Sequence, residues 1–172
     1  MRRIALSCFV LTATAAFAGN MTLTVDTLPA VQLTGFSTGA SNAGSISGGG
    51  GGTGKVSFKE FTFKATQSAA TPTLMLNMSQ GKHLKSAKVQ VRTSDGARLV
   101  AEWVLSDLLV SAVDVVNGDA DPNPKAKGAD FFLAPETLFS LQFVKYCYKV
   151  FAADGTSVAS QMCWDLAANT GS

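Results

Sequence analysis

The sequence has little of what an enzyme usually needs. It contains one histidine, His83, and a Ser-His-Asp or Cys-His arrangement would have to use it. The carboxylates are scattered singly rather than paired as a general acid and a general base. The sequence therefore predicts a protein with no enzymatic activity, no catalytic residue and no cofactor.

Neither sign of charge is in large excess, and no run of like charges occurs. The chain has 14 basic and 12 acidic residues. Two of the basic residues lie in an N-terminal segment that we expect to be removed, which leaves 12 of each sign. A chain near neutrality has no long-range field that would gather nucleic acid or anionic lipid. We therefore expect no nucleic-acid partner.

Two segments resemble ligand-binding motifs, but each lacks a residue that its chemistry requires. Residues 49–56 read GGGGTGKV, where Val56 replaces the hydroxyl side chain that holds magnesium in a phosphate loop. A strand-like run follows, whereas phosphate binding needs a helix N-terminus. The stretch from Asp119 begins like a calcium loop, but Pro124 stands where the sharp turn needs glycine. Two cysteines and one histidine are too few for a zinc site. We therefore expect no metal and no nucleotide.

The N-terminus predicts export. Two arginines precede an apolar run that is shorter than the roughly 20 residues needed to span a bilayer. The Ala-Phe-Ala sequence at 16–18 fits a signal peptidase, so we predict cleavage before Gly19. A retained membrane anchor is the alternative. Cleavage removes residues 1–18 and leaves a single domain over residues 19–172, periplasmic or secreted, with no further membrane contact.

Alternating apolar runs separated by turn signals predict a mostly β fold, either a β-barrel or a two-sheet sandwich, with one short α-helix. A change in the alternation at Glu60 predicts a β-bulge. The helix is expected over residues 71–81, with Thr71 as its N-cap and Gly81 at its exit. The expected strands are 21–28, 31–37, 55–64, 87–92, 99–105, 108–116, 137–151 and 158–164.

Within the predicted helix, Leu74, Met75 and Met78 share one face. Residues 39–54, by contrast, consist largely of glycine, serine, alanine and asparagine and have nothing to bury. The sequence therefore predicts a mobile loop there, between the second and third strands.

Two cysteines, Cys147 and Cys163, lie beyond the signal segment and flank the turn signal Ala-Asp-Gly-Thr at 153–156. A three-residue loop at 154–156 would put the two cysteines directly opposite each other in a hairpin, where side chains are close enough to bridge. Export supplies an oxidising compartment. We therefore predict a disulfide. Two buried free thiols are the alternative, because spacing alone does not fix the register.

Five stretches in a fixed order resemble the Hcp family of type VI secretion tube proteins, over roughly residues 34–169. They begin with the glycine run into a strand and end with the final hairpin. The stretches are GGGGGTGKVSFKEFTF at 48–63, SAATPTLM at 68–75, GKHLKSAKVQVR at 81–92, FSLQFVKYCYKV at 139–150, and ADGT at 153–156 with CWDLAAN at 163–169.

The resemblance implies a compact β-barrel of two sheets with one helix at its side. It also implies hexameric rings that stack into the inner tube of a contractile secretion machine and that carry effectors in the lumen. Spike, sheath and effector proteins are the further partners that it implies. The glycine-rich loop would lie where subunits or rings meet. The candidate contact residues are Gly48, Gly49, Gly50, Gly51, Gly52 and Gly54.

Two features depart from the family pattern. Tube proteins are loaded from the cytoplasm without a cleaved signal, whereas this chain has one, and only residues 28–30 separate its first two strands. The alternative function is therefore an exported, monomeric β-barrel binding module that keeps the fold without assembling a tube.

Overall fold

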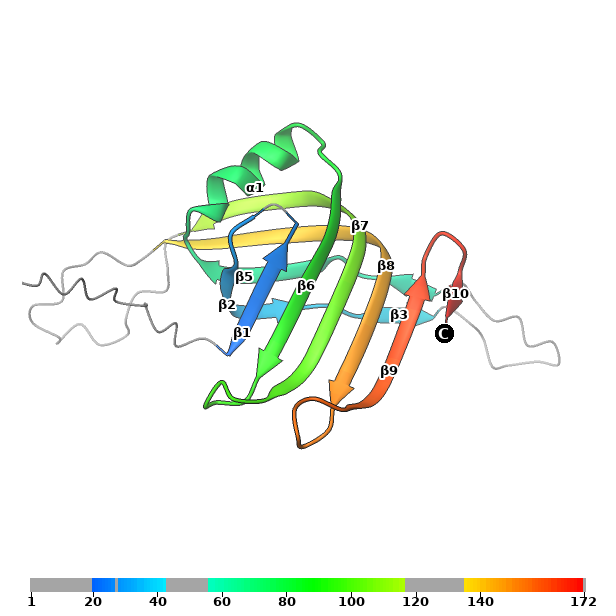
Figure 1. The fold of residues 1–172 in the computed structure, drawn as a ribbon. Helices are drawn as coiled ribbons and strands as arrows, with labels where there is room; N and C mark the ends of the chain where they lie inside the picture. The colour runs from blue at the N-terminus through cyan, green and yellow to red at the C-terminus, as the bar shows by residue number, and fades with distance from the viewer. Residues whose placement is uncertain (1–19, 27, 43–55, 117–134, 172) are drawn as a thin grey trace, which may run out of the picture.

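Figure 1 shows the computed structural model of the chain, which describes residues 20–26, 28–42, 56–116 and 135–171. The predicted signal segment and most of the glycine-rich loop lie outside these residues. The elements are β1 (Met21–Val25), β2 (Val31–Ser37), β3 (Ala40–Asn42), β4 (Val56–Phe58), β5 (Phe61–Thr66), α1 (Ala70–Ser79), β6 (Leu84–Arg92), β7 (Leu99–Val116), β8 (Glu136–Phe151), β9 (Val158–Asp165) and β10 (Thr170–Gly171).

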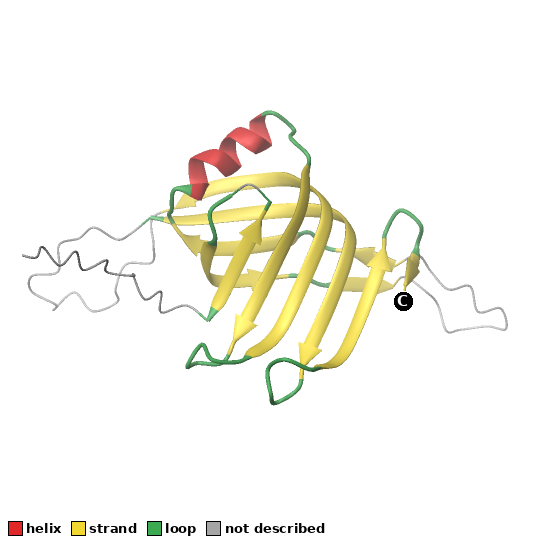
Figure 2. Cartoon of the chain, in the orientation of Figure 1, coloured by secondary structure: helices red, strands yellow, loops and turns green. Residues whose placement is uncertain are grey.

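The described strands form a closed barrel with an extension. The barrel order is β8-β5-β2-β1-β6-β7, and β7 pairs back onto β8, with every neighbour antiparallel. Beyond β8, the sheet continues through β9 and β10, while β3 and β4 form a separate ladder. Figure 2 shows α1 over one end of the barrel and the β9–β10 extension at the other side. The predicted mostly β fold with one short helix is confirmed.

Alternation along β5 shows how the barrel acquires its core. Phe61, Phe63 and Ala65 are buried, while Thr62 and Thr66 point outward. The ring of Phe63 stacks on those of Phe61 and Phe139, at centroid distances of 4.9 and 5.0 Å. Complete burial of such a side chain contributes about 1.5–3 kcal/mol. The prediction of one strand over 55–64 with a bulge at Glu60 was wrong, because β4 and β5 are separate strands in different sheets and residues 59–60 lie between them. The register shift on the β2–β5 ladder lies on β2, between Leu33 and Gly35.

The run from residue 99 to 116 is one strand, β7, so the prediction of two separate strands was wrong. Asp107 has a φ of 55°, a left-handed conformation in mid-strand. Leu105 and Leu108 are both fully buried although they are three residues apart. On β8, Phe143 and Tyr146 show the same spacing and are also buried. Both strands therefore change their core-facing side at this point and remain paired across it.

Helix α1 packs on β7, with Ala70, Thr71, Leu74 and Asn77 buried. The predicted cap was wrong. The N-cap position is Ala69, without a side-chain cap, and the Thr71 hydroxyl instead hydrogen-bonds the Thr137 hydroxyl at 2.9 Å. The shared apolar face was also wrong for Met75, which is 39% exposed.

The predicted helix exit at Gly81 is confirmed. Gly81 has a φ of 57°, and its N–H donates to the carbonyl of Met78 at 3.0 Å. The N–H of Lys82 donates to the carbonyl of Asn77 at 2.9 Å. These two bonds form a Schellman motif, in which glycine occupies the left-handed position.

Replacing Gly81 should therefore lower stability without any steric clash. A Cβ at Gly81 meets no atom within 4 Å. Gly81→Ala should therefore lower the unfolding free energy only by the cost of alanine in a left-handed conformation, about 1 kcal/mol. Gly35→Ala is the matched control, because a Cβ there is equally unobstructed and φ is ordinary. Urea unfolding should show a lower midpoint for Gly81→Ala than for Gly35→Ala. Equal midpoints would contradict this account of the helix exit.

Candidate assembly surface

The β8–β9 hairpin extends the sheet away from the barrel. One edge of β8 has two partners in turn: residues 136–141 pair with β5, and residues 145–151 pair with β9. β7 occupies the other edge along nearly the whole of β8. Strand β9 is fully described and contains no buried residue; Val158 is 46% and Met162 is 42% exposed. β9 is therefore held in place by β8 far more than by the core.

The outer edge of β9 is available for pairing. Among the described residues, β10 pairs with β9 at Trp164 and Asp165, which leaves the edge of residues 158–163 without a strand neighbour. Exposed backbone N–H and C=O groups on such an edge favour pairing with another chain.

Strand β7 has a second free edge, at the opposite flank of the β7–β8 ribbon. β6 pairs with β7 from Leu99 to Leu108, so residues 109–116 extend past the end of β6 and have no strand on that edge in the described part of the chain. Exposed apolar side chains lie on this half of β7 and on the helix that packs on the strand. They are Val115 (44%), Leu76 (53%) and Met75 (39%).

A disulfide joins the two strands of the hairpin. Cys147 is the cross-strand partner of Cys163, and the two cysteines are bonded, with their Cα atoms 4.0 Å apart. So short a separation is typical of a non-hydrogen-bonded antiparallel pair. The N–H and C=O of Cys163, and those of Gln161 two residues earlier, therefore point to the free edge.

The register of the cysteines was predicted, but the turn that produces it was not. The turn holds four residues, 153–156, and is closed by the N–H of Ala152 donating to the carbonyl of Ser157 at 2.8 Å. The predicted three-residue loop was therefore wrong. A register shift between Val150 and Phe151 compensates for the extra residue. A β-bulge therefore restores the opposed cysteines.

The side chain of Asp154 organises this turn. Its carboxylate accepts hydrogen bonds from the N–H groups of Thr156 and Ser157, both at 2.9 Å, and from the Ser157 hydroxyl at 2.6 Å. The Ser157 hydroxyl bond first, and then the two backbone bonds, lower the pKa of Asp154 to about 2. The carboxylate is therefore ionised, and the turn held, until the pH falls to that value.

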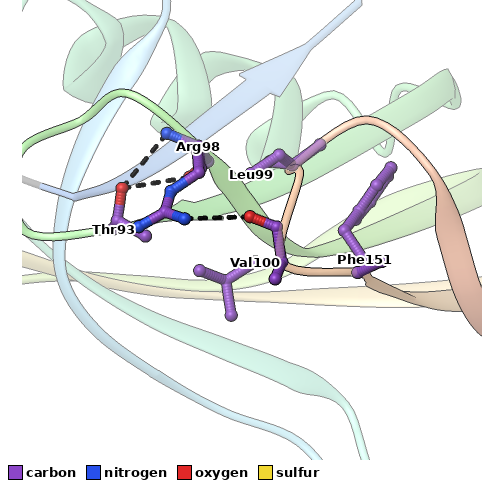
Figure 3. Close-up of a pocket in the computed structure, with 7 residues that line it drawn as sticks. Thr93, Arg98, Leu99, Val100 and Phe151 are labelled. Carbon is purple, nitrogen blue, oxygen red and sulfur yellow. Dashed lines mark hydrogen bonds between the residues drawn. The ribbon is translucent and has the colours of Figure 1, made fainter.

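The turn also rests against the β6–β7 turn. The Arg98 guanidinium donates to the carbonyl of Ala153 at 2.9 Å, and the N–H of Arg98 donates to the Thr93 hydroxyl at 3.1 Å (Figure 3). Gly155 has a φ of 70°, and a Cβ there would lie 2.7 Å from the Cβ of Arg98. The two turns line a small open hollow with Phe151 and Val100.

The other end of the hairpin carries the β3–β4 ladder. The ring of Phe58 on β4 lies against the rings of Tyr146 and Trp164, at centroid distances of 5.2 and 6.4 Å. Asn42 pairs with Val56 at the end of this ladder, where the chain leaves for residues 43–55. The candidate contact residues, Gly48 to Gly52 and Gly54, lie outside the described residues. Val56 begins a strand, which contradicts a phosphate loop here.

The outward face of β6, β7 and β8 is polar. Glu102 is only 7% exposed and accepts a hydrogen bond from the Gln90 amide at 2.9 Å. The ammonium groups of Lys88 and Lys149 each lie 3.7 Å from its carboxylate. These three partners compensate the burial of the carboxylate. The cluster therefore links three neighbouring strands.

The described residues offer little else that could bind or react. His83 is exposed in the link between α1 and β6. Groups of three or more potential metal ligands do not occur in the described ranges, and the stretch from Asp119 to Pro124 lies outside them. No helix in the described residues is both long and apolar enough to cross a membrane.

Comparison with known proteins gives one consistent result. A family model described as "Type VI secretion system effector, Hcp" matches residues 24–149, more than half of the chain. The match ends before Cys163. No curated protein matches the sequence.

Solved structures show the same fold. Hcp1 from Salmonella typhimurium has a TM-score of 0.69 at 18% identity, covering 88% of this chain and 97% of that one. A structure of a type six secretion system protein has a TM-score of 0.70 at 15% identity, covering 90% and 100%. A type VI secretion system effector from Yersinia pestis has a TM-score of 0.64 at 15% identity, covering 84% and 98%.

The contact between the two turns can be tested with two alanine variants. Gly155→Ala and Gly96→Ala both place alanine at a positive φ, 70° and 72°. Only at Gly155 does the new Cβ meet the Arg98 side chain and backbone, because a Cβ at Gly96 meets nothing within 4 Å. Gly155→Ala should therefore cost about 1–3 kcal/mol more in unfolding free energy than Gly96→Ala. Thermal melts of both variants measure the difference; similar melting temperatures would show that the turns are not tightly packed.

Proposed function

Because the chain belongs to the Hcp family of type VI secretion proteins, we propose that it is an exported structural subunit that assembles into rings. Hcp proteins are structural, secreted tube proteins rather than enzymes. The observation that carries the proposal is the pair of free strand edges, on β9 and on the second half of β7, at opposite flanks of one ribbon.

Two different edges at opposite flanks make a heterologous interface. The β9 edge of one subunit, residues 158–163, pairs with the β7 edge of the next, residues 109–116. Each subunit then offers the same pair of edges to its neighbours, and such a head-to-tail contact gives a ring when the rotation closes. From the family resemblance we propose that the ring is a hexamer. The glycine-rich loop, Gly48 to Gly54, adds contacts between subunits or between rings.

We infer that the subunit works outside the cytoplasm. In this proposal residues 1–18 are a cleaved signal and residues 19–172 are the exported domain. The disulfide supports this proposal, because such bonds form and persist in oxidising compartments. The lumen of the ring carries effectors, and spike and sheath proteins are the further partners. An exported monomeric barrel that acts as a binding module is the competing function.

Ring assembly through β9 can be tested at Gln161, whose N–H points to the free edge. Gln161→Pro removes that N–H while leaving the bonds to β8, since proline is tolerated on edge strands. Gln161→Ala is the matched control because it keeps the N–H. By light scattering and negative-stain imaging, the parent protein and Gln161→Ala should form rings, and Gln161→Pro should remain monomeric.

Two results would count against this assembly. Rings formed equally by Gln161→Pro would exclude the β9 edge as the interface. A parent protein that stays monomeric at high concentration would exclude ring assembly altogether and favour the binding module.

Export can be tested by the mass of the mature protein. Expression in a bacterium with a periplasm should give a product that begins at Gly19 by intact-mass spectrometry. Ala18→Arg should block cleavage, because the peptidase requires a small residue at this position, whereas Phe17→Leu should be cleaved normally. A parent chain that keeps residues 1–18 would point to a retained anchor.

A further inference from the structure

We propose that the Cys147–Cys163 disulfide is a redox switch that controls whether the β9 edge can pair with a second copy of the chain. When the two cysteines are oxidised, the bond holds β9 in the conformation that pairs. When they are reduced, β9 is no longer held in that conformation. The proposal rests on the ring assembly proposed above and adds its regulation.

The middle of β9 depends on the bond because little else holds it. Contacts from outside the hairpin reach the two ends of β9, where Phe58 lies against Trp164 and Arg98 bonds the turn at Ala153. Between these ends, Val158 and Met162 are largely exposed. As the outer strand of this sheet, β9 has no buried residue of its own and is hydrogen-bonded along residues 158–163 to β8 alone among the described strands. The ladder to β8 and the disulfide therefore provide most of the support.

The bond lies next to the groups that would pair with a neighbour. Cys163 and Gln161 direct their backbone N–H and C=O groups to the free edge, because Cys163 is in a non-hydrogen-bonded pair with Cys147. The disulfide therefore holds these groups in a straight, preorganised row. Without it, β9 must be ordered during assembly, and that ordering weakens the contact.

A reductant can reach the bond in the free subunit. Cys147 and Cys163 are partly exposed and line an open surface hollow with Lys145 and Trp164. Lys145 and Lys149 flank Cys147 on the same face of β8, because side chains two residues apart in a strand point the same way. Lys145 lies 3.4 Å from the Asp165 carboxylate and Lys149 lies 3.7 Å from that of Glu102.

The exchange uses a dithiol as reductant. One thiolate of the dithiol attacks Sγ of Cys163, and Cys147 leaves as a thiolate beside the two lysines, whose positive charges stabilise it. The second thiol of the dithiol then attacks the mixed disulfide and releases Cys163. The dithiol becomes a disulfide, and the protein gains two electrons and two protons as two thiols. A disulfide oxidant reverses both steps.

The test compares the full-length chain, exported and oxidised, with and without dithiothreitol. Light scattering over a concentration series gives the concentration at which rings form. Reduction should raise this concentration by about tenfold or more, because β9 must then be ordered during assembly. Removal of the dithiol and reoxidation should restore the rings. The double variant Cys147→Ser, Cys163→Ser should match the reduced protein and not respond to dithiothreitol.

Hydrogen exchange, measured below the concentration at which rings form, separates a local release from general unfolding. Reduction should speed exchange of the Ser160 and Met162 amides, which face β8, by about tenfold or more and leave the barrel amides of β1 and β6 unchanged. Faster exchange throughout the barrel would make the bond a general stabiliser and overturn the switch.

The outcomes also separate the switch from the proposed function. Rings that form at the same concentration in both redox states overturn the switch and leave ring assembly intact. An absence of rings in both states overturns the ring assembly, and the switch with it.

Discussion

The structure depends on one strand, β8, which serves two different neighbours on the same edge. Its first half pairs with β5 and closes the barrel, and its second half pairs with β9 and leaves the barrel. β7 follows it along the other edge through both halves. Because the two long strands run through this junction without interruption, the extension is a continuation of the barrel wall rather than a separate flap.

The junction requires both strands to change their core-facing side together. Asp107 takes a left-handed conformation at this point, and the buried positions on β8 move from Phe143 to Tyr146. A regular strand would instead direct Leu108 or Leu105 into solvent, at a cost of about 1.5–3 kcal/mol for each exposed side chain. Phe58 packs against Phe143 and Tyr146 on either side of the change, so the β3–β4 ladder supports it.

Local chemistry in the sequence was sufficient to predict most elements. Alternation predicted β5, and Gly81 marked the helix exit, because both follow from nearest-neighbour geometry. The predicted end of a strand near residue 106 was wrong. The alternation of apolar residues along β7 changes there, which in a single sequence looks like a strand end, although β7 and β8 remain paired through the change. The Thr71 cap failed because its hydroxyl is taken by Thr137, a partner 66 residues away.

The candidate surface was the least predictable part, for a physical reason. A free strand edge is defined by the strands that do not cover it, and the sequence does not state where β6 stops alongside β7 or where β10 stops alongside β9. The cysteines indicated the hairpin register, although the four-residue turn and the bulge that produce it leave no clear pattern. Side-chain motifs are local, whereas backbone edges are a property of topology.

The same distinction bears on how much side-chain identity the proposed assembly requires. Main-chain hydrogen bonds across a strand edge require a register and a free backbone, and they place few demands on side-chain identity. Under the proposed assembly, outward-facing residues can change while the edges persist. The side chains that matter most to it are then those beside the edges, namely Asp107 at the bend of β7 and the two bonded cysteines.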